Sequence, residues 1–449
     1  MDKYQIYKPS GVEWIGEIPS HWEINRLKWV TKIENSGIWG EDDEFPNSIN
    51  VPIPTTGQLS IEGEWYYDKM NFRHLSKEDW NKYKCVEGDI VVVKSSGSST
   101  NIITGKCGFI SKEDSEKFGF SNFLLRVRPL KITPKLVYYF LSSNLTKQRI
   151  ERMVSSTTYP NLKVDEYSNS ELLIPPFQEQ YQIVEFLDSK TELIDKLIST
   201  KERKITLLKE QRTSLINEVV TKGLNPNVKM KNTGIEWIGE IPEHWSMVSI
   251  KNLVSTKITD GPHETPEWVE EGIPFLSVES VQDNKLDFNK KRGYITEELH
   301  KIYSKKCKPQ RDDIFIVKSG STTGKSTIVE TDEEFNIWSP LCIVRSNKDK
   351  ILPRFLFNSI QSFYFRRFIE LGWSFGTQPN IGMGVIENLK IVLPPLQEQQ
   401  PIIDFLNHKI IDIDNLVDLE QKKIDLLKEY RQSLISEVVT GKIKVTTDE

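Results

Sequence analysis

The segment Gly11-Val-Glu-Trp-Ile-Gly-Glu-Ile-Pro-Ser-His-Trp22 returns as Gly234-Ile-Glu-Trp-Ile-Gly-Glu-Ile-Pro-Glu-His-Trp245, at an offset of 223 residues. Ten of the twelve positions are identical, which is far more than chance would give. A repeat with this spacing indicates that one structural plan is used twice along the 449-residue chain.

A second pair of matching segments lies later in each copy. Pro175-Pro-Phe-Gln-Glu-Gln180 matches Pro394-Pro-Leu-Gln-Glu-Gln399, and the similarity continues to Glu218-Val-Val-Thr221 and Glu437-Val-Val-Thr440. Between the two matching segments the halves diverge strongly. Each half is therefore constant, then variable, then constant. This order predicts a shared framework that carries a variable part facing something different in each half.

The segment after each Pro-Pro pair has the periodicity of a long amphipathic helix, with apolar residues at three- and four-residue steps. About 40 residues of helix at about 1.5 Å each give a rod of about 60 Å. The stripe of one copy can cover that of the other, which predicts an antiparallel coiled coil. The alternative is two separate helices, each packed on its own globular domain. The residues expected in the coiled-coil interface are Ile194, Leu197, Ile205, Leu208, Leu215, Val219, Ile413, Leu416, Ile424, Leu427, Leu434 and Val438.

The region ahead of each helix mixes short β-branched runs, such as Ile90-Val-Val-Val93 and Ile314-Phe-Ile-Val317, with helical patterns. We therefore expect an α/β or α+β fold: two globular domains separated by two long antiparallel helices, with an internal pseudo-two-fold repeat. The expected division is a globular domain at 1–175, a helical spacer at 176–223, a second globular domain at 224–393, a second spacer at 394–442, and a tail at 443–449.

Composition excludes several classes of protein. The four cysteines lie far apart without a CxxC pair, which argues against a zinc site and a disulfide framework. The sequence has no apolar run long enough for a membrane span, and none near its start that would indicate a signal peptide. A cytoplasmic location is therefore expected. The net charge of −5 counts mildly against a nucleic-acid binder, but a local basic surface can coexist with acidic faces.

Three apparent catalytic motifs are incomplete. Gly320-Ser-Thr-Thr-Gly-Lys-Ser326 lacks the spacing of a phosphate-binding loop, because Ser319 stands where glycine is needed. Ile174 stands where the Asn/Asp-Pro-Pro-Phe/Tyr motif of adenine methyltransferases has its polar residue. His21 and His244 repeat without a partner for metal or acid–base chemistry, which favours a structural role beside the neighbouring tryptophans.

Taken together, the two Gly-x-Glu-Trp-Ile-Gly-x-Ile-Pro-x-His-Trp segments and the two segments opening with Pro-Pro-x-Gln-Glu-Gln resemble the specificity subunits of type I restriction–modification systems. The resemblance covers nearly the whole chain. It implies two target-recognition domains held apart by the coiled coil, each reading one half of a split, asymmetric DNA sequence. It also implies that this chain is not catalytic.

The resemblance further implies the partners: double-stranded DNA, two methylation subunits and restriction subunits, with no membrane. No cofactor is expected in this chain, because S-adenosylmethionine, ATP and Mg²⁺ would act in the partner subunits. Three other interpretations stay open: the specificity subunit of a related bipartite-target system of the type IIB kind, a self-contained DNA methyltransferase, and a coiled-coil scaffold that binds only protein.

Polar loop residues in the two variable regions, several of them at matched places, are the candidate DNA contacts. Asn and Gln can read adenine, while Lys, Ser and Thr can meet phosphates. For several of them a simple turn before a strand is an equal alternative. The candidates are Lys94, Ser95, Ser96, Lys106, Thr157, Thr158, Tyr159, Asn161, His263, Lys318, Ser319, Thr322, Lys325, Thr377, Gln378 and Asn380. The aromatic residues Trp39, Trp65, Tyr66 and Tyr67 are expected in a core rather than stacked on bases.

Overall fold

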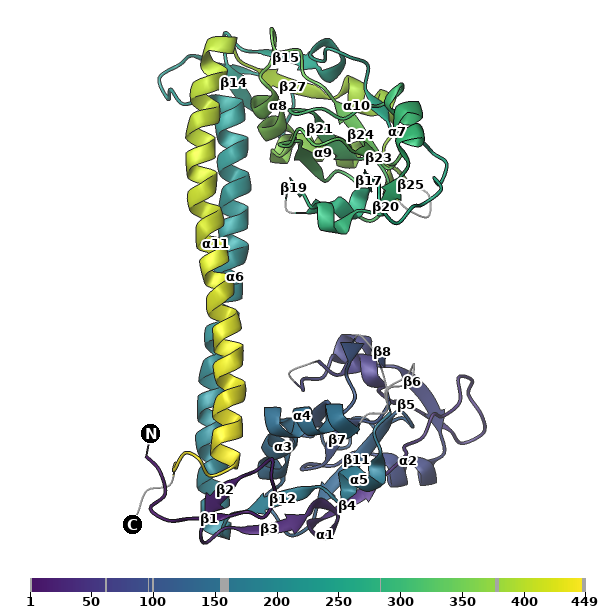
Figure 1. Ribbon diagram of the computed structural model, residues 1–449, viewed down its shortest axis with the longest axis vertical. Coiled ribbons are helices and arrows are strands. Elements are labelled where there is room, and N and C mark those ends of the chain that lie inside the picture. Colours follow the sequence, from purple (N-terminus) through teal and green to yellow (C-terminus); the bar gives the residue numbers. More distant parts are fainter. Residues whose placement is uncertain are drawn as a thin grey trace. The chain divides into compact units, whose positions relative to one another are not determined.

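The computed structural model describes residues 2–60, 63–95, 97–98, 101–153, 161–282, 284–375 and 379–445 (Figure 1). The chain forms two compact units: residues 1–201 together with 422–449, and residues 202–421. Both long helices contribute to both units, so this division differs from the five consecutive segments expected from the sequence pattern. Some candidate DNA contacts lie outside the described residues: Ser96, Thr157, Thr158, Tyr159, Thr377 and Gln378.

The repeated sequence forms the same frame in each unit. Two antiparallel strand pairs hold the frame: one at the start of the repeat, and one that joins the entrance of the variable region to its exit. In the first unit the pairs are β1 (Tyr7–Pro9) with β2 (Glu17–Pro19), and β3 (Glu23–Arg26) with β12 (Glu171–Ile174). In the second they are β13 (Met230–Asn232) with β14 (Glu240–Pro242), and β15 (Ser246–Ser249) with β27 (Lys390–Leu393).

Each variable region is built on an antiparallel sheet with the same strand order in both units. The first sheet has the order β10-β7-β11-β4, and the second has the order β22-β21-β24-β16. All residues of β7 and β21 are buried, because both faces of these continuous apolar strands are covered. The strands are β4 (Thr31–Glu34), β7 (Ile90–Val93), β10 (Cys107–Phe109), β11 (Leu124–Pro129), β16 (Thr259–Asp260), β21 (Ile314–Val317), β22 (Ser326–Ile328) and β24 (Leu341–Val344).

Shorter elements surround these sheets. In the first unit they are α1 (Leu27–Val30), β5 (Ile49–Pro52), β6 (Phe72–Leu75), α2 (Lys77–Tyr83), β8 (Gly97–Ser98), β9 (Asn101–Ile102), α3 (Pro134–Ser142), α4 (Asn144–Met153) and α5 (Val164–Ser168). In the second unit they are β17 (Ile273–Leu276), β18 (Val281–Gln282), β19 (Lys285–Leu286), β20 (Gly293–Ile295), α7 (Glu297–Ser304), β23 (Asn336–Ile337), α8 (Pro353–Ile360), α9 (Phe363–Leu371), β25 (Ser374–Phe375), β26 (Pro379–Asn380) and α10 (Met383–Asn388). The mixed α and β content expected from the sequence is confirmed.

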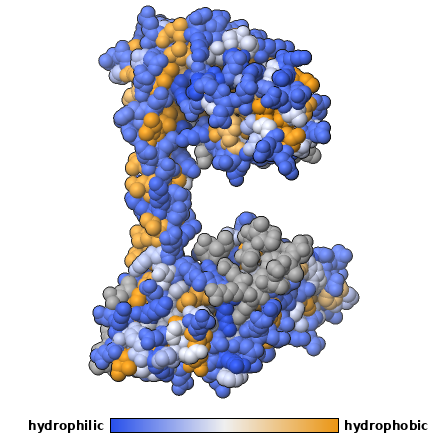
Figure 2. Space-filling view, in the orientation of Figure 1, coloured by the Kyte–Doolittle hydropathy of each residue, from blue (hydrophilic) through white to orange (hydrophobic). Residues whose placement is uncertain are grey.

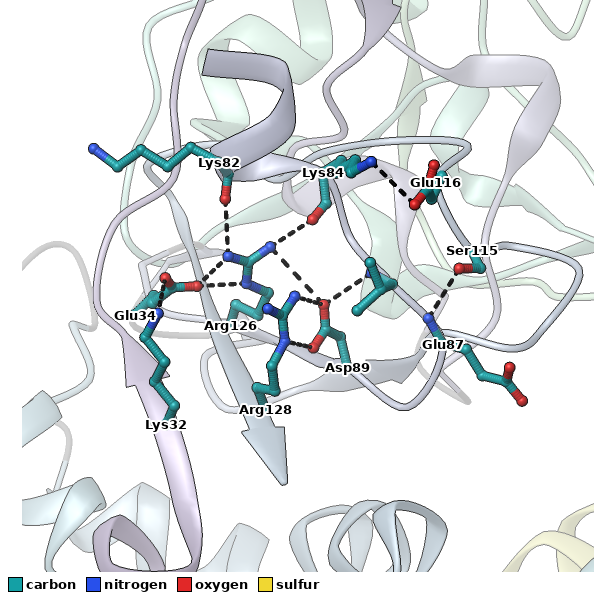
Figure 3. Close-up of polar contacts among 11 residues, drawn as sticks. Lys32, Glu34, Lys82, Lys84, Glu87, Asp89, Ser115, Glu116, Arg126 and Arg128 are labelled. Atoms are coloured by element: carbon teal, nitrogen blue, oxygen red, sulfur yellow. Dashed lines mark hydrogen bonds and ion pairs between the residues drawn. The ribbon is translucent and has the colours of Figure 1, made fainter. Parts of the chain in front are cut away.

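A buried aspartate holds the start of the central strand in each sheet. The carboxylate of Asp89 accepts two hydrogen bonds from Arg128, at 2.6 and 2.7 Å (Figure 3). Asp313 and Arg345 repeat this fork in the second unit, at 2.7 and 2.8 Å. Paired charges of this geometry satisfy a carboxylate that would be costly to bury alone. Arg126, which is buried and bonds Glu34 at 2.6 Å, has no counterpart in the second sheet, where Ile343 takes the matching place.

The long helices α6 (Phe177–Lys222) and α11 (Leu396–Val439) pair in antiparallel fashion. In the second unit, Nε of Arg212 lies 3.1 Å from Oδ1 of Asp414, and Nζ of Lys204 lies 2.9 Å from Oε1 of Glu420. From the first of these pairs to the second, the residue number falls along α6 and rises along α11, so the two helices run antiparallel. In the first unit, Arg431 pairs with Asp195 at 3.0 Å. The predicted coiled-coil pairing is thus present in each unit.

Most of the residues expected in the helix interface are covered. Ile194, Leu208, Val219, Ile413, Ile424, Leu434 and Val438 are buried, and Ile205, Leu215 and Leu427 are half-buried. Leu197 and Leu416 differ from the prediction, because they are 43% and 42% exposed. A step of four residues turns the helix by only about 40°, whereas a step of three turns it back by about 60°. In the first helix the buried line therefore continues from Ile194 to Ile198 and passes Leu197 by.

Each globular domain is fastened to both helices of its own unit. In the first unit, Tyr139 of α3 donates to Asp188 of α6 at 2.6 Å, and the amide of Asn144 donates to Ser436 of α11 at 3.1 Å. In the second, the amide of Tyr364 donates to Asn217 of α6 at 3.0 Å. Within the described residues, no helix is long and apolar enough to cross a membrane.

We expect Leu434→Ala to lower the free energy of unfolding by about 2–5 kcal/mol, because Leu434 is 1% exposed and its removal leaves a cavity between the helices. Leu426→Ala, on the same helix of the same unit but 62% exposed, is the matched control and should change the free energy by less than about 0.5 kcal/mol. Urea unfolding of the full chain measures both. Equal effects of the two substitutions would contradict the assignment of the interface.

Candidate nucleic-acid interface

The two repeated motifs of each half bind each other through one carboxylate. Oε2 of Glu179, in the first turn of α6, accepts a hydrogen bond from the Trp22 indole at 2.9 Å and lies 3.0 Å from Nε2 of His21. In the second unit, Oε2 of Glu398 accepts from the Trp245 indole at 3.1 Å, and Oε1 of Glu398 lies 2.7 Å from Nε2 of His244. A carboxylate is also favoured in the first turn of a helix by the helix dipole. The structural role expected for the two histidines is confirmed.

The glutamine that follows each of these glutamates ties the helix to the variable domain. The side-chain oxygen of Gln180 accepts from the amide of Thr133 at 2.9 Å, just ahead of α3. Gln399 does the same with the amide of Leu352 at 2.8 Å, ahead of α8. These two glutamines were not among the predicted functional residues, although the repeated Gln-Glu-Gln triplet indicates that they form part of the frame.

In the first unit, candidates from two distant parts of the sequence meet at the end of β7. Lys94 and Ser95 follow this strand, and Ser95 forms a β-bridge with Asn161. The amide of Leu162 donates to the Lys94 carbonyl at 2.8 Å, and Nζ of Lys94 donates to the Asn35 carbonyl at 2.8 Å. Burial lowers the pKa of Lys94. Asn161 is exposed, so its amide is presented to solvent beside Ser95.

Lys106 is turned away from this group. Its backbone carbonyl accepts from the amide of Val93 at 2.8 Å, so its main chain lies beside β7. Its half-buried side chain, however, donates to the carbonyl of Leu59. Lys94 is also half-buried and donates from its side chain to a backbone carbonyl, so both lysines remain predicted contacts.

The second unit assembles the same constellation at the end of β21. Lys318 and Ser319 follow the strand, Ser319 forms a β-bridge with Asn380, and the amide of Ile381 donates to the Lys318 carbonyl at 2.8 Å. Asn380 is exposed, as Asn161 is in the first unit. The same backbone contacts therefore recur at the matched positions of the two units, whereas the sequences around them differ.

Two further candidates lie in the turn between β21 and β22. The amide of Lys325 donates to the Thr322 carbonyl at 3.0 Å, and the Lys325 carbonyl accepts from Val317 at 2.8 Å. Thr322 is half-buried and Lys325 is exposed. Their turn therefore adjoins the end of the same strand that carries Lys318.

A buried carboxylate organises the charges of the second constellation. Asp260 is 1% exposed and receives Nζ of Lys318 at 2.5 Å and Nζ of Lys306 at 2.7 Å, with Nε2 of His263 at 3.3 Å. Burial opposes ionisation of this carboxyl, but the hydrogen bonds and charges of Lys306 and Lys318 outweigh it and hold the pKa of Asp260 below its usual range. His263 is 73% exposed, so the loop directs its ring outward.

The aromatic residues near the start of the chain do not share one environment. Trp65 is buried against Phe118, with ring centroids 4.7 Å apart, as expected for a core residue. The same expectation is wrong for Trp39, Tyr66 and Tyr67, which are exposed. The prediction failed because these residues lie outside the α-helices and β-strands, where the pattern of apolar residues indicates which side chains are buried. In the described part of the chain, no cluster of His, Cys, Asp and Glu is arranged to hold a metal ion.

Comparison with known proteins gives one consistent result. The family model described as "Type I restriction modification DNA specificity domain" matches residues 19–207 and 242–429. The chain is 26% identical over 441 residues to the putative type I restriction enzyme MjaX specificity subunit of Methanocaldococcus jannaschii, covering 96% of each chain. It is 22% identical over 448 residues to the type I restriction enzyme EcoKI specificity subunit of Escherichia coli K12, covering 95% of this chain and 90% of that one.

A solved structure shares the fold. Its title concerns complex assembly and conformational transition of the type I restriction–modification system, and the chain compared has a TM-score of 0.68 at 16% sequence identity. The match covers 95% of this chain and 99% of that chain.

Replacing Asp260 with asparagine should lower the free energy of unfolding by about 1.5–3 kcal/mol near pH 7, because two lysines lose a charged hydrogen-bond partner. Since the folded pKa is depressed, the carboxylate contributes fully above its unfolded pKa of about 3.9, and the contribution is lost as the pH falls through the lower folded value. The gap between wild type and variant should therefore narrow below about pH 4.

Urea unfolding followed by tryptophan fluorescence between pH 7 and pH 3 measures this gap. Asp332→Asn is the control, because Asp332 pairs with Arg311 at the surface and should show no measurable change. A loss that stays constant over the whole pH range would contradict a role for the ionised Asp260.

Proposed function

The chain belongs to the family of type I restriction–modification DNA specificity proteins, and on this premise we propose that it selects the DNA sequence on which such a system acts. The observation that carries the proposal is the matched pair of constellations at the ends of β7 and β21. Each constellation places a lysine, a serine and an exposed asparagine at the end of a buried strand. The sequences around the two constellations differ, so each domain would read its own half of an asymmetric, bipartite target.

The chemistry of the two constellations supports a division of labour on DNA. Exposed asparagines such as Asn161 and Asn380 suit the edge of adenine, where an amide can donate and accept at once. Exposed cations such as Lys325 suit phosphates, which set register and orientation without reading sequence. His263 adds a donor or acceptor to the second domain. The net charge of −5 is compatible with this proposal, because a local basic surface can coexist with acidic faces on one protein.

We further propose that this chain acts without catalysis of its own. Methylation subunits would supply S-adenosylmethionine chemistry, and restriction subunits would supply ATP- and Mg²⁺-dependent cleavage. Apolar side chains at the surface of the long helices offer docking area for the methylation subunits (Figure 2). These residues are Leu193, Leu197, Leu426 and Tyr430 in the first unit and Leu207, Ile411, Leu416 and Leu419 in the second.

We also propose that the length of the two long helices sets the unread spacer between the half-sequences. Because α6 and α11 are paired by ion pairs and a buried apolar line in each unit, neither helix can change length alone without losing its partner.

Exchange of residues 30–170 for the matching segment of another family member should change one half of the methylated sequence and leave the other half and the spacer intact. The frame contacts of His21, Trp22 and Glu179 lie outside the exchanged segment, so docking on the helix is retained. Methylome sequencing of cells that carry the exchanged chain reads the outcome. Changes in both halves would overturn the assignment of one reader to each domain.

Insertion of one heptad after Leu208, with a matching heptad after Val417 in the opposed stretch of α11, should lengthen the spacer by about three base pairs. Seven residues add about 10.5 Å and keep the apolar line in register, and one base pair rises about 3.4 Å. A variant with residues 202–208 replaced at constant length controls for the sequence change. An altered half-sequence with an unchanged spacer would contradict the proposal that helix length sets the spacing.

A further inference from the structure

Two exposed aromatic rings adjoin the constellation of the first unit. Trp39 and Phe123 are 40% and 43% exposed, and their rings meet at right angles with centroids 5.7 Å apart. The carbonyl of Phe123 accepts from the amides of Lys94 and Ser95, at 2.9 and 3.3 Å. Phe123 is therefore attached directly to the segment that bridges to Asn161. The aromatic pair therefore adjoins the polar candidates in the folded chain.

The Trp39 ring is held in place rather than left to move. The Arg73 guanidinium lies over it, 4.8 Å from the ring centroid, and Arg73 is itself paired with Asp42. The loop is pinned on both sides of the tryptophan, because Ile38 donates to the Phe120 carbonyl and Glu41 forms a β-bridge with His74. An apolar surface fixed in this way, yet left open to solvent, is poised for a ligand.

The second unit has different chemistry at the matching positions. The backbone amide of Lys318 donates to the Pro340 carbonyl, just as the backbone amide of Lys94 donates to the Phe123 carbonyl. Pro340 therefore corresponds to Phe123. Gly37 and Gly261 each lie against a backbone carbonyl, of Phe120 and Ile337 respectively, where a Cβ would come within 1.8 and 1.9 Å of the oxygen. Two residues beyond them stand Trp39 and His263, which therefore correspond. The apolar pair thus belongs to the first reader.

We propose that Trp39, with Phe123 as its support, reads the methyl group of a thymine in the half-sequence recognised by the first domain. The inference rests on the proposed function and deepens it. In the major groove of duplex DNA, the C5 methyl of thymine is the apolar group that base edges present. Arg73 and Phe123 already contact the Trp39 ring, so the remaining exposed surface suits a small apolar group better than a whole stacked base.

The test uses the full chain as purified with its native partners, and duplexes that carry its methylome-defined target. Each thymine of the first half-sequence is replaced in turn by deoxyuridine, which removes only the methyl group. At one position wild type should bind about fourfold more weakly, the effect of about 0.8 kcal/mol for one buried carbon group. The Trp39→Ala variant should bind the thymine and deoxyuridine duplexes equally. Trp39→Phe should retain part of the discrimination.

Trp29→Ala is the matched control, because Trp29 is also exposed and also has an arginine, Arg26, over its ring at 5.5 Å. It should keep the full preference for thymine. The inference is overturned if Trp39→Ala discriminates as wild type does, or if wild type ignores every methyl group. It is also overturned if Trp39 instead favours duplexes with an unpaired base, since this would indicate stacking. If wild type does not prefer the target to a scrambled duplex, it is the proposed function that fails.

Discussion

The hydrogen bonds between a first-turn glutamate and a tryptophan–histidine pair are the constraint on which each half of this protein depends. Glu179 joins the repeated Ile-Pro-x-His-Trp segment to the start of α6, and Glu398 does the same for α11. Trp22 and Trp245 are fully buried, so an indole left without a hydrogen-bond partner would be costly in both units. The entrance of the variable region is thereby fixed to its exit.

A closed frame of this kind allows the intervening sequence to diverge. The strand pairs β3–β12 and β15–β27 bring the ends of each variable region together, and the Asp–Arg forks hold the central strands in the same place in both units. The loops at the ends of those strands lie outside these contacts, so their side chains can differ between the units. Trp39 in the first unit corresponds to His263 in the second, while Lys94 and Lys318 stay at matched positions.

This separation of frame from loop connects the fold to DNA recognition. Reading a sequence requires side chains held rigidly enough to discriminate between bases, on a scaffold that tolerates new side chains. In the first unit the proposed reading surface combines an exposed asparagine with an apolar ring, and in the second it combines an exposed asparagine with charged groups around Asp260. Two unlike surfaces on equivalent frames are what an asymmetric target requires.

Much of this organisation was determined by the sequence alone. The repeat, the paired helices and most of their interface follow from local periodicity and from identity between distant segments. Leu197 and Leu416 were predicted to be buried but are exposed. A pattern of three- and four-residue steps does not show which of the two steps follows the line of contact between the helices. The domain boundaries drawn from the pattern also differ from the compact units, because burial joins residues across the sequence.

Only the tertiary structure shows which of the predicted residues come together in the candidate site. Sequence reasoning selected Lys94, Asn161, Lys318 and Asn380, but the bridges that unite them cross more than 60 residues each. It also placed Trp39 in a core, because an aromatic side chain in a loop has no periodicity to reveal its exposure. The physical reason is the same in each case. Periodicity reports which face of an element is covered, whereas a loop's neighbours depend on how the chain folds back upon itself.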